Sequence, residues 1–299
     1  MKRFLSFLLF LILLLPAAAP AETIVTSFYP VWVFTLNLTQ GLEDITVRNL
    51  AAPETGCLHD YTLQPSDMKA LAQADALLIN GGGMESFLPL VTAAYPELPV
   101  IDASVDIAQP EEGTWAEFGE PEEGEEGNSH FWMDPSRAVR MVSNLAEGLV
   151  RILPDDEAAI RENLAAYTAR LEQVAEMLKG AAEESGVREV VIIHEAFPYF
   201  AEACGLPVLA VVEKEPEDDL PVGLRAEVIR LIASREEAPL LIKSRENDPV
   251  ADMLSAETGA PVCELNTLTS GPEDAPLDFY ETAMAENLAA LLAAFSPAD

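Results

Sequence analysis

The chain has 299 residues and a strong acidic excess, with 51 acidic and 17 basic side chains for a net charge of −34 at pH 7. Such a surface repels phosphate backbones and anionic lipid, which argues against nucleic-acid or membrane-surface partners. After residue 21 no segment approaches 18 continuous apolar residues. The mature chain is therefore expected not to insert into a membrane.

Residues 1–21 have the composition of a secretory signal peptide. Two basic residues precede an apolar run from Phe4 to Leu15, and the segment ends in Ala19-Pro20-Ala21. The run is too short to span a bilayer, and the A-x-A pattern predicts cleavage before Glu22. The mature charge is then 15 basic minus 51 acidic residues, or −36. Because no cysteine stands at the cleavage point, the sequence predicts a periplasmic or otherwise extracytoplasmic protein without a lipid anchor.

Three cysteines, Cys57, Cys204 and Cys263, belong to the mature chain. In an oxidising compartment at most one internal disulfide can form among them, which leaves one thiol over. The sequence does not choose the pair.

Strand-like and helix-like segments alternate from residue 22 onward. Predicted strands begin at Glu22 and cover Ile45–Leu50 and Ala76–Asn80, while predicted helices follow Pro30 and cover Ser66–Ala74, with Ser66 as N-cap. This alternation is typical of a parallel sheet with crossover helices.

Residues 110–129 interrupt this rhythm. Eight of these twenty residues are glutamate and four are glycine, so the segment is predicted to be a mobile acidic loop. Helices are then predicted over 136–152 and, after Pro154, over 155–185. At 1.5 Å per residue the second helix would span about 45 Å, long enough to link two lobes.

The alternation restarts after Gly186. Strands are predicted over 189–194, 206–212, 239–244 and 260–265, and helices over 196–205, 222–234, 248–259 and 277–295. The sequence therefore predicts an α/β fold with two parallel-sheet lobes, residues 22–154 and 186–299, joined by a long rigid helix over 155–185. A ligand site is expected in the cleft between the lobes, at the carboxyl ends of strands.

The chain has only three histidines, and each falls in a loop or at a strand end: His59, His130 and His194. Three neutral imidazoles with one position left suit tetrahedral Zn²⁺. Their spacings match no local zinc motif such as H-E-x-x-H, so the fold would have to assemble the site. The residues alone leave a structural or surface role open for each histidine.

Longer motifs connect these histidines to a known family. In chain order they are TSFYPVWVF, HDYTLQPSDMKALAQADALLINGGGME, HFWMDPSRAV, HEAFPYFAEACGLPV and ADMLSAETGAPV. With them the mature chain resembles the cluster A-I solute receptors of metal ABC importers, which have two α/β lobes joined by a rigid long helix and bind zinc or manganese. The family motifs are like P-H-D-Y, H-x-W-x-D-P and H-D-A-F. The resemblance implies that His59, His130 and His194 are metal ligands.

Four neighbouring residues have alternative roles. Asp60 is either a partner of the metal site or a turn residue. Asp134 is expected to cap the next helix rather than to bind metal. Glu195 stands where the family has Asp, and is expected in a loop or helix-start role, with contact to the site as the alternative. Cys57 is an alternative thiolate ligand.

The fourth ligand departs from the family pattern. The family often has Asp in a segment like LDPLG or SDAMG, and the matching segment ELNTLT has Asn266 at that position. Glu264 lies two residues earlier on the same strand face and is an alternative ligand, as is a water molecule. Three imidazoles with at most one carboxylate favour zinc over manganese.

These features predict a receptor rather than an enzyme. It is expected to act as a monomer that captures one Zn²⁺, or alternatively Mn²⁺, and delivers it to the membrane permease of a metal ABC importer. A secreted zinc hydrolase, with Glu195 or Glu264 as general base, is the alternative from another class. An adhesin with the same fold also stays open.

Overall fold

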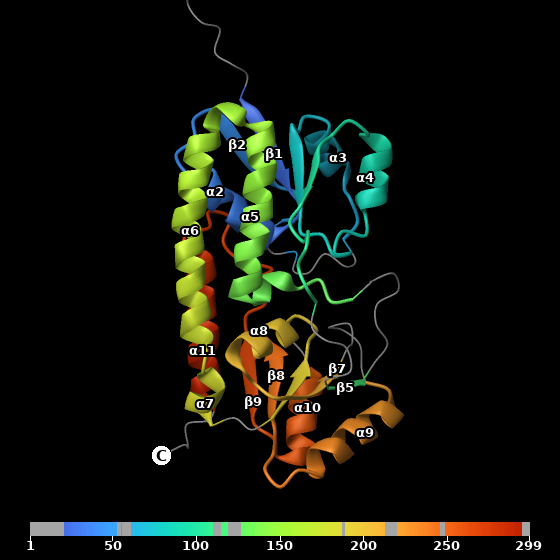
Figure 1. Ribbon diagram of the computed structural model, residues 1–299. Helices are drawn as coiled ribbons and strands as arrows, with labels where there is room; N and C mark the ends of the chain where they lie inside the picture. Colours follow the sequence, from blue (N-terminus) through green and yellow to red (C-terminus); the bar gives the residue numbers. More distant parts are fainter. Residues whose placement is uncertain are drawn as a thin grey trace, which may run out of the picture.

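The computed structural model describes residues 21–52, 55, 61–109, 115–118, 127–186, 189–212, 220–245 and 249–294. In these ranges the chain forms two parallel sheets, one above the other in Figure 1, with long helices running beside both. This arrangement confirms the predicted α/β fold with two lobes. No helix in the described ranges is long and apolar enough to cross a membrane.

The first sheet has the strand order β2-β1-β3-β4 with every pair parallel. Its elements are β1 (Glu22–Thr26), α2 (Tyr29–Leu38), β2 (Ile45–Asn49), α3 (Pro65–Leu71), β3 (Ala76–Ile79), α4 (Leu88–Ala94) and β4 (Val100–Asp102). The central strand β3 is buried along its whole length, as expected for an apolar strand covered on both faces. The sequence patterns did not predict α4 and β4, which have only seven and three residues.

Helix α3 begins earlier than predicted, with Gln64 rather than Ser66 as its N-cap. The side chain of Asp67 accepts the backbone N–H of Gln64 at 2.6 Å, while the Gln64 side chain accepts from the backbone of Asp67. This reciprocal capping, together with Pro65 in the first turn, fixes where the helix starts.

The second sheet has the strand order β5-β7-β6-β8-β9, again with every pair parallel. Its elements are β5 (Ala116–Phe118), β6 (Val190–Ile193), α8 (Phe197–Cys204), β7 (Val208–Val212), α9 (Val222–Ala233), β8 (Leu240–Ser244), α10 (Pro249–Thr258) and β9 (Val262–Leu265). The four strands predicted after Gly186 are confirmed as β6 to β9.

Strand β5 corrects the prediction that residues 110–129 form one loop of the N-terminal lobe. Ala116–Phe118 pairs with Ala210–Val212 of β7 and so belongs to the second sheet. Phe118 packs against a core cluster of that lobe, a contact that outweighs the glutamate-rich composition around it. Residues 110–114 and 119–126 of the acidic segment lie outside the described ranges.

The predicted linking helix over 155–185 is interrupted near its end. Helix α6 covers Glu157–Leu178 and a separate helix α7 covers Ala181–Ser185. Between them Gly180 has a φ of 84°, a left-handed conformation that glycine adopts without a steric penalty. Helix α6 still runs beside both sheets in Figure 1, packed against α5 (Pro135–Ile152), α2 and the last helix, α11 (Phe279–Ala293).

One hydrophobic core passes through both lobes. It includes Ile24 of β1, Leu171 of α6, Ile242 of β8 and Leu291 of α11, all completely buried. A second, smaller cluster lies between the second sheet and helices α9 and α10. Because burial of apolar surface is the main stabilising term in folding, the two lobes share much of their stability.

Cys204 and Cys263 are buried free thiols. Burial raises the pKa of each to about 12, so both are poor nucleophiles. Cys57 lies outside the described residues.

Glu85 is buried beside the turn that follows β3. Its Oε1 accepts the N–H of Asn80 at 2.7 Å, and its Oε2 accepts the N–H of Gly81 at 3.0 Å. The side chain of Asn80 in turn donates to the carbonyl of Ser129 at 2.9 Å. Burial raises the pKa of Glu85 to about 7, even though both N–H groups favour the charged form.

We expect Glu85 to make the protein less stable as the pH rises. Its folded pKa is above the value of about 4.3 in an unfolded chain, so its contribution to the free energy of unfolding is complete below about pH 4 and is lost as the pH rises through 7. The loss is roughly 3 kcal/mol. Urea unfolding of the metal-free protein at about pH 5 and about pH 8 should show a smaller difference for Glu85→Gln than for the unmodified chain. Glu97→Gln, an exposed change in the same lobe, is the control, and an equal pH dependence in all three proteins would contradict the assignment.

Candidate metal-binding site

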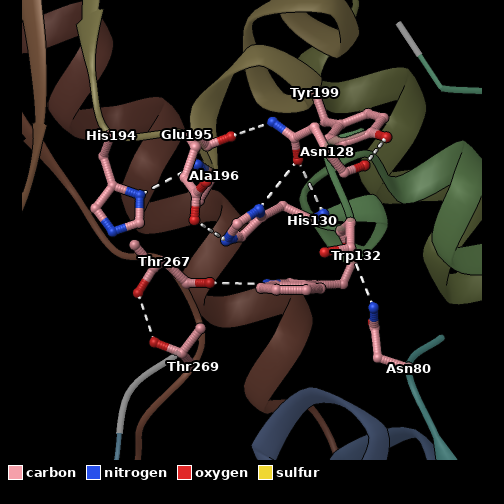
Figure 2. Close-up of polar contacts among 11 residues, drawn as sticks. Asn80, Asn128, His130, Trp132, His194, Glu195, Ala196, Tyr199, Thr267 and Thr269 are labelled. Carbon is pink, nitrogen blue, oxygen red and sulfur yellow. Dashed lines mark hydrogen bonds and ion pairs between the residues drawn. The ribbon is translucent and has the colours of Figure 1, made fainter. Parts of the chain in front are cut away.

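His130 is completely buried and precedes a single 3₁₀ turn over Phe131–Met133. Asn128 folds back on it, as Figure 2 shows: the Asn128 Oδ1 accepts the backbone N–H of His130 and faces its Nδ1, both at 3.0 Å. Since the backbone N–H fixes the amide with its oxygen toward the ring, Nδ1 carries the hydrogen of the neutral imidazole. The lone pair is then on Nε2, the nitrogen available to a metal.

Asn128 also ties His130 to the loop after β6. Its Nδ2 donates to the carbonyl of Glu195 at 2.6 Å. Its own carbonyl accepts the hydroxyl of Tyr199, on α8, at 2.6 Å. One half-buried side chain thus holds the orientation of the His130 ring relative to the end of a strand of the second sheet.

His194 lies at the carboxyl end of β6, immediately before α8, where ligands of open parallel sheets bind. The ring centroids of His130 and His194 are 6.1 Å apart. Two imidazoles bound to one tetrahedral zinc would have centroids about 5 Å apart. The two rings would therefore have to move about 1 Å closer to bind the same ion.

The two rings have opposite hydrogen-bonding patterns. The backbone N–H of Ala196 donates to Nδ1 of His194 at 3.1 Å, which leaves the hydrogen of this neutral ring on Nε2. Binding of a metal at Nε2 therefore requires His194 to give up the bond to Ala196 and to change its tautomer. His130 requires no such change.

Trp132 holds the histidine motif against the C-terminal part of the chain. Its Nε1 donates to the carbonyl of Thr267 at 2.8 Å, and its own carbonyl accepts the hydroxyl of Tyr280 at 2.7 Å. The Trp132 ring is completely buried with its centroid 4.9 Å from that of His130. The W of the H-x-W-x-D-P pattern is thus a structural support for the preceding histidine.

The turn after β3 supports the same motif from the first lobe. Besides the bond from Asn80 to Ser129, Gly82 has a φ of 66°, and a Cβ at this position would lie 2.6 Å from the Phe131 ring. Only glycine fits this close approach without displacing Phe131. Gly82 of the GGG run therefore has a packing role next to His130.

Of the other predicted site residues, some lie outside the described ranges and Asp134 has the role predicted for it. His59, Asp60 and Cys57 lie outside the described residues. The N-cap role of Asp134 is confirmed, since its Oδ1 accepts the N–H of Ser136 at 2.8 Å. Among the residues the structure describes, no three histidine, cysteine, aspartate or glutamate side chains already stand close enough to hold a metal ion.

The two fourth-ligand candidates from ELNTLT both have other partners. Asn266 accepts the N–H of Leu268 through Oδ1 at 2.8 Å. Glu264 forms an ion pair with Lys243 at 3.1 Å and its side chain is 58% exposed. Glu195, in contrast, places Oε1 3.4 Å from Nε2 of His130, so it contacts the site as well as lying in the loop before α8.

Sequence reasoning missed Asn128 and Asn80. A signal for Asn128 existed, because the side chain of asparagine often accepts the backbone N–H of the residue two positions later and so forms a turn. The contact of Asn80 with Ser129 joins positions 49 residues apart, and no local pattern indicates it.

Comparison with known proteins gives one family. The family model described as "Zinc-uptake complex component A periplasmic" matches residues 24–294. Similar proteins include the zinc-binding lipoprotein AdcA of Streptococcus pneumoniae, 26% identical over 277 residues and 90% of this chain, and the high-affinity zinc uptake system protein ZnuA of Bacillus subtilis, 25% identical over 277 residues. The chain spans only 54% of AdcA but 86% of ZnuA. The manganese-binding lipoprotein MntA of Halalkalibacterium halodurans is 24% identical over 77% of this chain and 75% of its own length.

Solved structures share the fold. The Zn(II)-bound ZnuA-like domain of Streptococcus pneumoniae AdcA superimposes with a TM-score of 0.71 and 26% identity, over 92% of this chain and 98% of that domain. The Pseudomonas aeruginosa protein FpvC in complex with Mn²⁺ gives a TM-score of 0.76 at 22% identity, over 92% of this chain and 98% of FpvC.

We expect the two described histidines to be opposite tautomers in the metal-free protein. With only three histidines in the chain, ¹⁵N NMR of the imidazoles can be assigned by single substitutions, well above the usual histidine pKa of about 6.5. His130 should carry its hydrogen on Nδ1 and His194 on Nε2. Asn128→Ala should remove the preference of His130 for the tautomer with hydrogen on Nδ1. Asn128→Asp keeps an acceptor at this position and should retain that tautomer. The same tautomer at both positions would contradict this geometry.

Proposed function

The chain belongs to the family of periplasmic zinc-uptake components whose model matches residues 24–294, and from this premise we propose that it is an extracytoplasmic receptor for one Zn²⁺. The ion is its cargo, which it delivers to the membrane permease of an ABC importer. Zinc would be held by His59, His130 and His194, and the protein would act by binding and release rather than by catalysis.

The observation that carries this proposal is the orientation of His130. In the neutral ring, the contact with Asn128 places the hydrogen on Nδ1, so the Nε2 lone pair of this buried side chain is the one that a metal can bind. The His194 ring lies 6.1 Å away from centroid to centroid. A buried imidazole fixed by a hydrogen bond at its other nitrogen is the usual arrangement of a histidine that binds metal. His59, from the first lobe, would be the third ligand.

Manganese is the alternative cargo, and the similarity to MntA favours it. The proposed ligands favour zinc, because imidazole nitrogen suits zinc whereas manganese prefers oxygen donors. The relatives with the highest similarity given above are also named for zinc.

The proposed partner and location follow from the family. We infer a periplasmic or other extracytoplasmic monomer that docks on its permease. Two of the relatives are named lipoproteins, so attachment through a lipid is the alternative to free diffusion.

Competition titration of the metal-stripped protein with Zn²⁺ and Mn²⁺ tests the proposal. We expect one tight zinc equivalent, weakened by about 100-fold or more in His59→Ala, His130→Ala and His194→Ala, because each would remove a direct ligand and not only an outer partner. Glu264→Gln, a change at a 58% exposed carboxylate that pairs with Lys243, is the control and should bind zinc as the unmodified chain does. Tight manganese binding with zinc no better would favour the alternative cargo, and the absence of any stoichiometric metal would refute the receptor function.

A further inference from the structure

Three imidazoles leave one position of a tetrahedral zinc ion to be filled. Building on the proposed function, we propose that Glu195 supplies this fourth ligand through a carboxylate oxygen. The position aligned with the family's usual aspartate, Asn266, would then have a structural role only.

Asn266 uses one lone pair of its only side-chain acceptor in a turn. Its Oδ1 accepts the N–H of Leu268 at 2.8 Å, and Leu268 has a left-handed φ of 62°. The backbone N–H and carbonyl of Asn266 are bonded to the side chain of Asn287 at 2.7 and 2.8 Å, which fixes the residue in place. The other end of the amide is an NH₂ group, and it has no lone pair to offer a metal. An aspartate would have a second oxygen at this point.

Exchanging the oxygen and the NH₂ group of the Asn266 amide does not make it a better metal ligand. The NH₂ group would then face the N–H of Leu268, which sets two donors against each other and leaves a backbone group unpaired at a cost of about 1–3 kcal/mol. The turn therefore fixes the orientation in which Oδ1 accepts the N–H of Leu268. A neutral amide oxygen that already accepts a hydrogen bond is a weaker metal ligand than a carboxylate.

Glu264 is held by an ion pair on the second sheet. Lys243, whose side chain is only 6% exposed, pairs with Glu264 at 3.1 Å and with Asp252 of α10 at 3.2 Å. Removing Glu264 from this cluster to reach the histidines would leave the largely buried ammonium with less compensation. Its neighbours Cys263 and Leu265 are buried, as expected where strand residues alternate between faces.

Glu195 already lies at the spacing that one zinc ion imposes. Zinc bonds of about 2.0–2.1 Å to nitrogen and 2.0–2.2 Å to oxygen, at a tetrahedral angle, hold two ligand atoms about 3.3–3.5 Å apart. The Oε1 of Glu195 is 3.4 Å from Nε2 of His130. This separation is long for a charge-assisted hydrogen bond, which is usually 2.7–2.9 Å, but it fits two ligands of a shared ion.

The backbone of Glu195 is positioned by the same residue that orients His130. The Oδ1 of Asn128 faces Nδ1 of the His130 ring, and its Nδ2 donates a hydrogen bond to the Glu195 carbonyl, as Figure 2 shows. The side chain is 22% exposed, so the carboxylate remains accessible to an incoming cation. The predicted site is thus three imidazoles and one carboxylate, with two ligands contributed by adjacent residues at the end of β6.

Cobalt substitution distinguishes a ligand from a nearby charge. With Co²⁺ in the site, the unmodified chain should give the intense visible bands of a closed four-coordinate ion, and added azide should not change them. Glu195→Gln, which keeps the size and removes the charge, should weaken zinc binding by about 100-fold and open the fourth position, so that azide shifts the cobalt bands. Glu264→Gln is the matched control and should behave as the unmodified chain in both measurements.

Other results would overturn the assignment. Weaker zinc binding by Glu195→Gln with an unchanged cobalt spectrum would give Glu195 only an indirect role, and an equal loss in Glu264→Gln would reduce the effect to general charge. An azide-sensitive spectrum in the unmodified chain would place water at the fourth position. Failure of His130→Ala and His194→Ala to affect binding would instead reject the proposed function itself.

Urea unfolding of each metal-free variant checks that it is folded, and Glu195→Asp provides a second variant that keeps the carboxylate but moves it.

Discussion

Trp132 makes the contact on which the arrangement of the site depends. It lies completely buried two residues after His130, donating to Thr267 and accepting from Tyr280. Both partners come from the end of the chain, while the turn after β3 reaches the same motif through Asn80 and Gly82. A buried polar network of this kind is stable only when each member is paired. The short turn around His130 is therefore held from three separate parts of the sequence.

Asn128 converts this rigid support into a chemical preference. Protein packing alone can place an imidazole ring, but only a hydrogen-bond partner decides which of its nitrogens carries the hydrogen. The same asparagine holds the backbone of Glu195, so the orientation of one candidate ligand and the position of another depend on a single amide. His194, which bonds to its own loop through Ala196, is prepared differently. The candidate site therefore combines one ring whose Nε2 would be ready for a metal with one that would have to rearrange.

The sequence predicted the fold better than it predicted the details of the site. Continuous apolar runs such as Ala76–Ile79 and Val190–Ile193 are strong strand signals because both of their faces are covered. The acidic composition around Ala116–Phe118 concealed β5, which is held by pairing with β7 and by the packing of Phe118 against the core of the second lobe. The motif around His194 predicted a ligand, yet the commitment of Asn266 to Leu268 depends on local geometry that composition does not record.

The last helix has a consequence for how the chain folds. Helix α11 follows the second sheet in sequence, yet it packs against the linking helix α6 and against α2 of the first lobe, and it contributes Leu291 to the shared core. The first lobe therefore lacks part of its helical cover until the final residues of the chain are available. Contacts between the two ends of a chain are slow to form because a long loop must close first. A chain emerging with its N-terminus first would complete both lobes in one late cooperative step, rather than one domain after the other.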